Sequence, residues 1–259
     1  MTGGPDLGFT AHPINGGAVF TIDRPTKLNA LTKSVLLGLA DCIDRLEAEN
    51  AKLLVITGAG ERAFCAGTDL AEMQGMEMDA RLEKNAMARS LLVRLSRSSL
   101  ISVAAINGLA LGGGLELAMA CRLRVALENV EFGLPEVKLG LLPAYAGTQF
   151  LPAIIGPARA EELMLTGRSV GVNEALAIGL IHRAVATGSD IVAAALDFGA
   201  EVVCHSPAAV AAIRACVAAS GPQVTEEGLA VEDTYVRSVF AGSEARAGVE
   251  AFLSRRKNR

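Results

Sequence analysis

The chain has 259 residues, enough for one large domain with a buried core. Hydrophobic residues make up 51% and charged residues 20% of the chain, which excludes a disordered protein. The net charge of −4 and the pI of about 5.5 disfavour a protein that binds nucleic acid or an anionic membrane surface.

The N-terminal ten residues, MTGGPDLGFT, have neither the basic nor the apolar region of a secretory signal. The five cysteines form no C-x-x-C pair, and their odd number favours reduced thiols. The sequence therefore predicts a cytoplasmic protein.

The first half of the chain alternates strand and helix patterns. Four short apolar runs are typical of buried strands, and they cover residues 17–23, 52–58, 102–108 and 123–127. Thr32 is placed to cap a helix that reaches Asn50, because apolar side chains recur there on one face at helical spacing. This order of elements predicts an α/β layered fold.

Residues 100–120 carry a single charge, Glu116, and match a membrane-spanning helix in length. Asn107 and four glycines interrupt the run, and its first part, ISVAAIN, has the pattern of a buried strand that enters a turn. We therefore interpret the run as two elements of a protein core, with a helix that begins just after the glycines.

From about Gly156 onward the strand patterns end and helices dominate. Pro157 opens a helix that Gly167 closes, and a short helix follows in NEALAIGL. Further helices are expected near residues 190–204, 206–219, 225–240 and 243–256. We expect a core over residues 1–195 and a helical region over residues 196–259.

Two glycine motifs match known fingerprints without the required context. Residues 58–63 fit the G-x-G-x-x-A of a dinucleotide site, but a second glycine turn follows in place of a helix. Residues 167–171, GRSVG, fit the G-x-S-x-G nucleophile elbow, but they lie between two helical patterns. We interpret both motifs as turns.

Three segments in order carry a more specific signal. AFCAGTDLAEM (63–73), NGLALGGGLELA (107–118) and FGLPEVKLGLLP (132–143) resemble the consecutive signatures of the enoyl-CoA hydratase/isomerase (crotonase) family. RPTKLNAL (24–31) resembles its first coenzyme A loop, and residues 241–257 resemble its closing helix. The resemblance implies a crotonase-type spiral of strand-strand-helix units with a C-terminal helical region.

The resemblance also implies a thioester substrate, whose carbonyl oxygen gathers negative charge in the transition state. Two backbone N–H groups aimed at that oxygen stabilise it, and glycine-rich turns allow the close approach. By motif position these donors are the amides of Thr68 and Gly113. Because the donors are backbone groups, we expect the Thr68 side chain to be free to vary.

Glu116 and Glu136 match the positions of the two catalytic glutamates in the hydratases of the family, whereas isomerases tend to keep only the second. Two carboxyl groups facing one small site repel, so one should hold a proton near neutral pH. We expect Glu116 to deprotonate the water that attacks C3 and Glu136 to protonate C2. Taken alone, Glu116 fits equally well as a residue that binds the N-terminal amides of its helix.

The resemblance places further residues around coenzyme A and the acyl group. They are Lys27, Leu28, Ala30, Ala66, Asp69, Leu70, Gly112, Pro135, Ala144, Tyr145, Phe252 and Arg255. The loop PAYAGTQ departs from the family pattern, because Ala144 and Tyr145 replace small, glycine-rich positions. Tyr145 either fills part of the acyl pocket or faces solvent. Ala71 stands where a lysine often meets the coenzyme phosphates, so Lys27 and Arg255 are expected to supply positive charge.

The activity that the resemblance implies is that of a hydro-lyase adding water to 2-enoyl-CoA in fatty acid β-oxidation. No metal or redox cofactor is implied, and trimers paired into hexamers are expected. The alternatives are a double-bond isomerase of the same fold, an inactive scaffold and an RNA-binding relative. The five basic residues of RLEKNAMARSLLVRLSR ring their helix without forming a stripe, which favours a solvated face over an RNA-binding surface.

Overall fold

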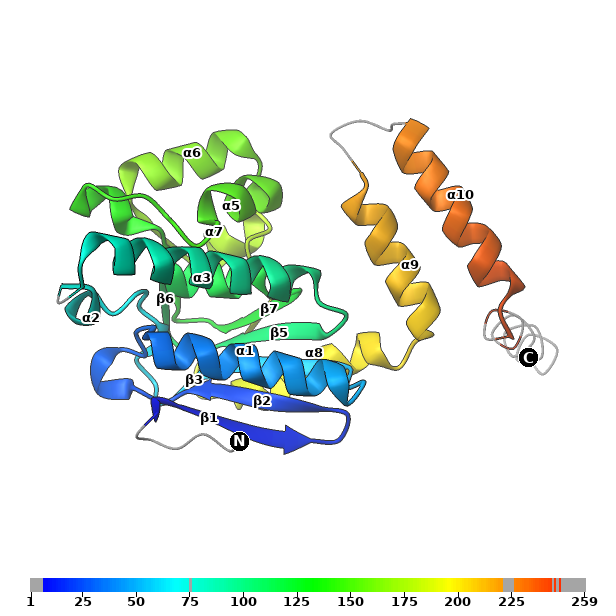
Figure 1. Cartoon of the computed structure of the whole chain (residues 1–259), viewed down its shortest axis with the longest axis horizontal. Helices are drawn as coiled ribbons and strands as arrows, with labels where there is room; N and C mark the ends of the chain where they lie inside the picture. Colours follow the sequence, from blue (N-terminus) through cyan, green and yellow to red (C-terminus); the bar gives the residue numbers. More distant parts are fainter. Residues whose placement is uncertain (1–6, 75, 221–225, 244, 246, 248–259) are drawn as a thin grey trace. The chain divides into compact units, whose positions relative to one another are not determined.

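The computed structural model describes residues 7–74, 76–220, 226–243, 245 and 247. The chain divides into two units, Met1–Gly199 and Ala200–Arg259. The boundary expected after residue 195 lies four residues before this division, inside helix α8 (Ile191–Val203). The first unit contains two β-sheets and the helices packed on them (Figure 1).

The larger sheet has six strands in the order β1-β2-β3-β5-β7-β10. These strands are β1 (Phe9–Ile14), β2 (Gly17–Ile22), β3 (Leu53–Gly58), β5 (Ile101–Ile106), β7 (Leu123–Leu127) and β10 (Arg183–Val185). β1 pairs with β2 in antiparallel orientation, and the other pairs are parallel. Every residue of β3 and β5 is buried, as expected for parallel strands covered on both faces.

The smaller sheet has four strands of three residues each in the order β4-β6-β8-β9. They are β4 (Ala63–Cys65), β6 (Leu109–Leu111), β8 (Glu131–Gly133) and β9 (Ser169–Gly171). Each of β3, β5 and β7 is followed by a strand of this sheet and then by a helix. The expected spiral of strand-strand-helix units is therefore confirmed.

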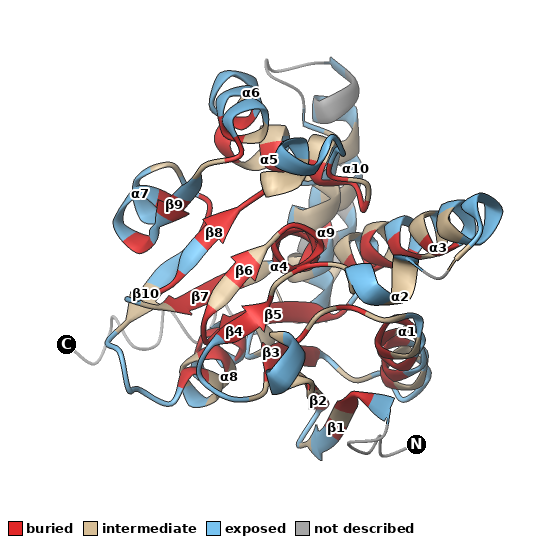
Figure 2. Ribbon diagram, turned by 90° about the vertical axis from the view of Figure 1, so that its left-hand side faces the viewer, coloured by how far each residue is buried: buried red, intermediate tan, exposed pale blue. Residues whose placement is uncertain are grey.

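Eight α-helices begin in the part of the first unit that the structure describes. Besides α8 they are α1 (Lys33–Ala48), α2 (Leu70–Gln74), α3 (Met78–Arg97), α4 (Gly113–Ala120), α5 (Gly147–Ile155), α6 (Pro157–Thr166) and α7 (Val172–Ala177). Thr32 caps α1 as predicted, because its hydroxyl accepts from the Val35 amide at 3.3 Å. All residues of α4 are buried, and Figure 2 shows this helix enclosed by the surrounding elements.

Two short 3-10 helices contribute to the loops that carry the sequence motifs. They are η2 (Pro25–Lys27) and η3 (Pro135–Leu139). η3 begins at a proline, as helical starts often do, and ends at Gly140 with φ of 68°.

Buried asparagines close the glycine turn at residues 58–63. The Asn107 Nδ2 donates to the carbonyls of Gly58 (2.8 Å) and Gly60 (2.7 Å). The Asn29 Nδ2 donates likewise to the carbonyl of Ala63 at 2.7 Å. Strand β4 follows this segment in place of a helix, so the predicted turn is confirmed.

Two predictions about local structure were wrong. Strands β9 and β10 lie beyond Gly156, where the sequence predicted none, because three residues are too few to show a period-2 pattern. Residues 167–171 connect α6 to α7 as expected, but 169–171 form β9 within that connection. Helix α4 starts at Gly113, inside the glycine run and not after it.

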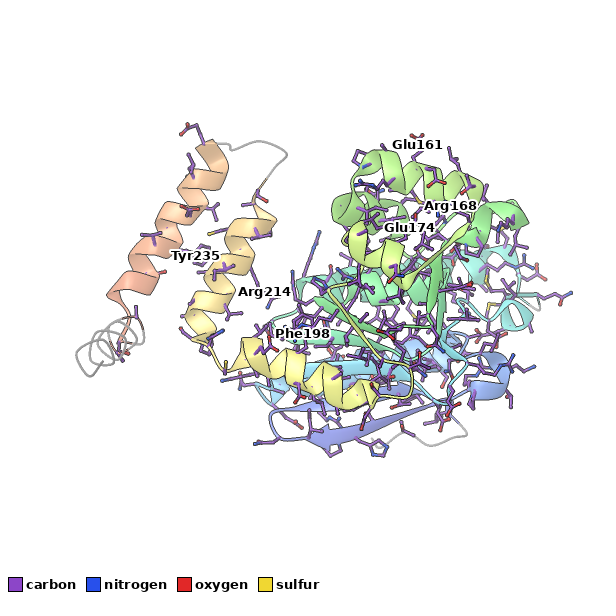
Figure 3. All side chains as sticks on the ribbon, turned by 180° about the vertical axis from the view of Figure 1, so that it is seen from behind. Glu161, Arg168, Glu174, Phe198, Arg214 and Tyr235 are labelled. Atoms are coloured by element: carbon purple, nitrogen blue, oxygen red, sulfur yellow. The ribbon has the colours of Figure 1, made fainter. Side chains whose placement is uncertain are left out.

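The corner between α6 and α7 is held by an ion-pair cluster at the surface. Arg168 pairs with Glu162 at 2.8 Å and with Glu174 at 2.7 Å, and Figure 3 shows Arg168 and Glu174 side by side. These side chains are exposed, so each pair stabilises the fold by less than about 1 kcal/mol.

The second unit contains α9 (Pro207–Ala218) and α10 (Glu226–Ala241). The helix expected near residues 243–256 lies largely outside the described residues. Within the described ranges no single helix is long and apolar enough to cross a membrane, and only α8 and α9 reach the required length and hydropathy together, across a break.

Candidate active site

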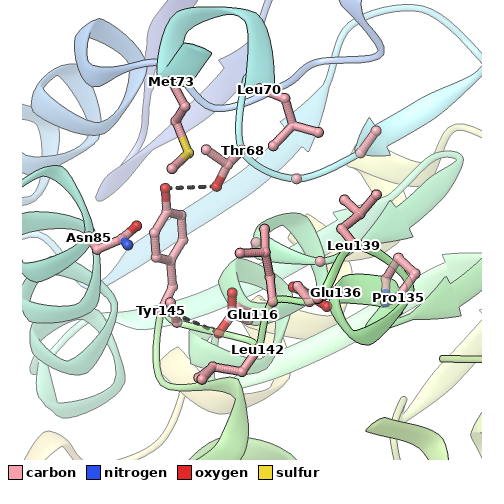
Figure 4. A pocket seen from close by; sticks show the side chains of 17 residues that line it. Thr68, Leu70, Met73, Asn85, Glu116, Pro135, Glu136, Leu139, Leu142 and Tyr145 are labelled. Carbon is pink, nitrogen blue, oxygen red and sulfur yellow. Dashed lines mark hydrogen bonds between the residues drawn. The ribbon is translucent and has the colours of Figure 1, made fainter. Parts of the chain in front are cut away.

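A cavity of about 390 Å³ brings together five segments of the chain. The segments are α2 with the loop that enters it, α3, the N-terminus of α4, η3 with the residues after it, and the loop that enters α5 (Figure 4). Its wall consists of Ala66, Gly67, Thr68, Leu70, Met73, Asn85, Gly112, Gly113, Glu116, Pro135, Glu136, Leu139, Gly140, Leu141, Leu142, Ala144 and Tyr145. Both predicted glutamates and both predicted amide donors therefore face one space.

Glu116 lies in the first turn of α4 and is 1% exposed. Its Oε1 accepts hydrogen bonds from the amides of Tyr145 (2.8 Å) and Gly147 (2.6 Å). The pKa of this carboxyl is raised to about 7: burial is the largest cause, the nearby Glu136 also raises it, and the two amides oppose the shift. The amides that Glu116 binds belong to the loop that enters α5 and not to its own helix.

Glu136 lies in η3 and approaches the glycine run from the other side. Gly112 has φ of 51°, a backbone conformation that favours glycine. A Cβ at this position would also lie only 3.0 Å from the Glu136 Oε1. The Glu136 Oε2 is buried and has no hydrogen-bond partner within the described part of the chain. Burial raises the pKa of this carboxyl as well. Burial is the largest cause for both glutamates, and the repulsion predicted from the sequence contributes as a smaller cause to the pKa of Glu116.

Thr68 and Gly113 each present a backbone N–H that has no acceptor among the described residues. Gly113 is the first residue of α4, so its N–H has no partner within the helix. Thr68 forms a β-bridge with Leu31, but the bonds of this bridge run through its neighbours Gly67 and Asp69. A Cβ at Gly67 would lie 3.4 Å from the Gly113 nitrogen, so the two loops are in close approach.

Asp69 supports the Thr68 loop and does not line the cavity. Its carboxylate lies 2.8 Å from the Arg24 Nη1 and accepts from two amides at the start of α2. Burial alone would raise the pKa of Asp69, but the Arg24 guanidinium and these amides outweigh it, so the pKa is lowered. The buried Lys84 pairs with Glu72 of α2 and so fixes the other end of this short helix.

Tyr145 is 2% exposed, so the alternative that it faces solvent is wrong. Its ring lies against Gly113, where a Cβ would be 3.1 Å from the ring atoms Cδ2 and Cε2. The Thr68 Oγ1 donates to the Tyr145 hydroxyl at 2.7 Å. The Thr68 side chain, expected to be free of constraint, therefore holds this phenol in place.

Six of the predicted substrate-binding residues line the cavity. These are Ala66, Leu70, Gly112, Pro135, Ala144 and Tyr145. Lys27, Leu28 and Ala30 lie outside its wall, although the Leu28 carbonyl accepts from the Ala66 amide at 2.9 Å. Lys27 is exposed, and Phe252 and Arg255 lie outside the described residues. The roles of all these residues stay predictions.

Met73 and Asn85 line the cavity from α2 and α3 and were not predicted from the sequence. The position of Asn85 could have indicated it: it shares a helical face with the buried Ala88 and Leu92, where an apolar residue is the norm. Within the ranges that the structure describes, no three His, Cys, Asp or Glu side chains lie close enough to hold a metal ion.

Comparison with known proteins gives consistent similarities over nearly the whole chain. The family model described as enoyl-CoA hydratase/isomerase matches residues 14–259. A crotonyl-CoA hydratase of Syntrophomonas wolfei is 35% identical over 242 residues, covering 93% of this chain and 92% of the relative. A short-chain-enoyl-CoA hydratase of Clostridium acetobutylicum is 34% identical over 241 residues, with the same coverage. The crystal structure of an enoyl-CoA hydratase from Bacillus anthracis has a TM-score of 0.88 at 31% identity and covers 96% of each chain.

Proposed function

This chain belongs to the enoyl-CoA hydratase/isomerase family, and we propose that it adds water across the C2=C3 double bond of a 2-enoyl-CoA thioester, with Glu116 and Glu136 as its acid–base pair. The relatives named as hydratases support a hydro-lyase activity. The observation that carries the proposal is the convergence of the buried Glu116, the half-buried Glu136 and two unpaired N–H groups on one cavity.

The two amides supply the electrostatic part of the mechanism. The thioester oxygen is held by the N–H groups of Thr68 and Gly113. Negative charge moves onto this oxygen when water attacks C3, and fixed donors stabilise it in the enolate. The Gly113 donor also stands at the positive end of the α4 dipole, which adds to the effect.

The two carboxyl groups supply the proton transfers. With a pKa of about 7, Glu116 is partly ionised at neutral pH and accepts a proton from the attacking water. The oxygen of that water bonds to C3, and the π electrons of C2=C3 move toward the thioester carbonyl. Glu136, whose pKa burial also raises, then gives a proton to C2 as the enolate collapses, so its carboxyl has to enter this step protonated. The bare Oε2 of Glu136 is available to meet the substrate or the water.

The test is an assay of both chemistries on wild type, Glu116→Gln and Glu136→Gln. Hydration is followed as the loss of ultraviolet absorbance of crotonyl-CoA, and isomerisation as conversion of a 3-enoyl-CoA to the 2-enoyl-CoA. We expect each variant to lose hydration by about 100- to 10,000-fold.

Hydration at a near wild-type rate by Glu116→Gln would contradict the assigned role of Glu116. Loss of activity confined to Glu136→Gln, together with double-bond migration by the wild type, would favour the isomerase alternative. RNA binding has less support, because Lys84 is buried and Arg94 is paired with Asp44 and Glu47.

The proposal extends to the setting of the enzyme. We expect trimers that pair into hexamers, a cytoplasmic location and a role in β-oxidation, with coenzyme A entering only as part of the substrate. Light scattering of the full chain tests the assembly. Exhaustive dialysis against a chelator tests the cofactor statement, with an unchanged hydration rate as the expected result.

A further inference from the structure

Besides the two glutamates, three polar side chains line the cavity, and they lie at one end of it. Tyr145 enters from the loop before α5, Thr68 from the loop before α2, and Asn85 from α3 (Figure 4). The Tyr145 ring spans this end, since its backbone N–H binds Glu116 and its hydroxyl binds Thr68. The cavity is therefore closed here by a wall that carries hydrogen-bonding groups.

The hydroxyl pair of Thr68 and Tyr145 keeps an unused proton. Each hydroxyl has one O–H, and one of the two protons is consumed by the 2.7 Å bond between them. Whichever hydroxyl donates, the other O–H has no acceptor within the described part of the chain. Tyr145 is 2% exposed, and burial raises the pKa of its phenol to about 12, so it remains protonated in neutral solution. A buried donor without an acceptor is costly unless a ligand or water meets it.

Asn85 adds a second unused set of groups. Its side-chain amide offers two donors and an acceptor, and it makes no hydrogen bond to any described residue. Figure 4 shows this amide on the same side of the cavity as the Tyr145 ring. The wall thus offers at least one O–H and one amide to whatever reaches it.

The position of the wall relative to the chemistry follows from the proposed function. The thioester oxygen lies at the amides of Thr68 and Gly113, and C2 and C3 lie between the two glutamates. We place the rest of the acyl group beside the Tyr145 side chain, which lines the same cavity as both glutamates. The cavity wall contains no Lys or Arg, and it contains two carboxyl groups, so a negatively charged acyl terminus is disfavoured there.

We propose that Thr68, Tyr145 and Asn85 form a hydrogen-bonding end wall that selects short 2-enoyl-CoA substrates whose acyl group ends in a neutral oxygen, such as a hydroxyl or a carbonyl. This inference rests on the proposed hydratase function and names its substrate class. Tyr145 acts as a specificity-determining residue through its side chain, while its backbone N–H positions Glu116.

The test uses three substrates that differ only at C6. They are 2-hexenoyl-CoA, 6-hydroxy-2-hexenoyl-CoA and the mono-CoA thioester of 2-hexenedioic acid. We expect the wild type to have its highest kcat/KM for the hydroxy substrate, about fivefold above the alkyl substrate, since one neutral hydrogen bond is worth about that factor. Asn85→Leu should lower the ratio of hydroxy to alkyl kcat/KM toward one. The double variant Thr68→Val/Tyr145→Phe should do the same, and both hydroxyls are removed because Tyr145→Phe alone leaves the Thr68 O–H free for the substrate.

Tyr235→Phe is the matched control, because it removes the same hydroxyl from the other tyrosine of the chain, on α10, which does not line the cavity (Figure 3). We expect its ratio to equal that of the wild type. A wild type that hydrates crotonyl-CoA without preferring the hydroxy substrate overturns the end wall, as does an unchanged ratio in Thr68→Val/Tyr145→Phe. A preference for the carboxylate substrate would contradict the proposal that the acyl group ends in a neutral oxygen. Failure to hydrate any enoyl-CoA overturns the proposed function itself.

Discussion

Two walls of the cavity are built in different ways. The wall from Gly112 through α4 is a helix start in which every residue is buried, and it presents backbone groups and one anchored carboxylate. The wall from Pro135 to Tyr145 is a 3-10 helix and a loop, with Leu139 and Leu142 more than 60% exposed. Stabilising the charge on a thioester oxygen needs donors that do not move during the reaction, and the buried backbone of the first wall meets this need. In our proposal, the side chains of the second wall select the acyl group of the substrate.

The two carboxyl groups repeat this contrast at the level of single atoms. Glu116 has one oxygen fixed by two amides, whereas Glu136 has one oxygen without any partner in the described chain. The Glu116 carboxyl is therefore held in position, whereas the Glu136 Oε2 can still accept a hydrogen bond. Changes in the first wall should affect turnover and stability, and changes in the second should affect substrate specificity.

Apart from the glutamate variants, removal of the Gly113 donor is expected to have the largest effect. Gly113→Pro deletes the N–H at the first position of α4, where proline fits the helix. The loss of one such donor lowers kcat by about 100- to 1,000-fold. The comparison is with Gly113→Ala, which adds the same Cβ beside Tyr145 but keeps the N–H. Equal activity in the two variants, with equal circular dichroism spectra, would show that the Gly113 N–H does not contribute to catalysis.

The close packing of the buried wall is expected to appear as stability. A Cβ at Gly114 would lie 2.0 Å from the Cys65 carbonyl oxygen, so the backbone has to move. We expect Gly114→Ala to lower the free energy of unfolding by about 2 to 3 kcal/mol. Gly171→Ala is the control, because its Cβ meets nothing within 4 Å. Urea unfolding midpoints measure the difference, and equal midpoints would contradict a tightly packed α4.

On the less packed wall, the expected effect is on chain length. Tyr145→Ala opens the closed end, and each buried methylene is worth about 0.8 kcal/mol. Three further carbons then correspond to about 2.4 kcal/mol, or about 50-fold in relative kcat/KM. The measurement compares enoyl-CoA substrates of four, six, eight and ten carbons in wild type and variant. An unchanged profile would show that Tyr145 does not limit the pocket.

The smallest expected effect is the response to pH. Glu116 must be ionised to accept a proton, so kcat/KM should fall about tenfold per unit as the pH drops below about 7. Stability should change in the opposite direction. The folded-state pKa is above the ordinary value of 4.5, so this contribution is fully present below pH 4.5 and is lost as the pH rises to about 7. In Glu116→Gln the free energy of unfolding should depend less on pH between 4.5 and about 7. An unchanged pH dependence would show that another group causes it.

The long elements were predictable because their patterns are long enough to read. The strands at residues 53–58 and 101–106 are continuous apolar runs, and α1 shows a helical stripe behind a capping threonine. The smaller sheet was hidden, because strands of three residues leave no periodicity. It is nevertheless the sheet that brings the Cys65, Leu111 and Gly133 loops together at the site.

Within the site, the motifs predicted the groups that meet but not how they are held. The bond between Thr68 and Tyr145 joins residues 77 positions apart, and no local pattern reports such a contact. Burial was also underestimated as a cause of the glutamate pKa shifts, since the sequence gives the two charges and not the surrounding packing. Asn85 belongs to no motif, and only its position on an apolar helix face marks it.

The anchoring of Glu116 by the amides of Tyr145 and Gly147 has a consequence for redesign. The segment that we propose to shape the acyl pocket also holds, through its main chain, the carboxylate that we propose as a proton acceptor. A library that varies the side chains at positions 142, 144 and 145 leaves that anchor intact and samples new substrates. Insertions or deletions between Pro143 and Gly147 shift both amides. Exchanging this loop for a longer or shorter one from a relative is therefore expected to lower turnover even where it widens the range of substrates.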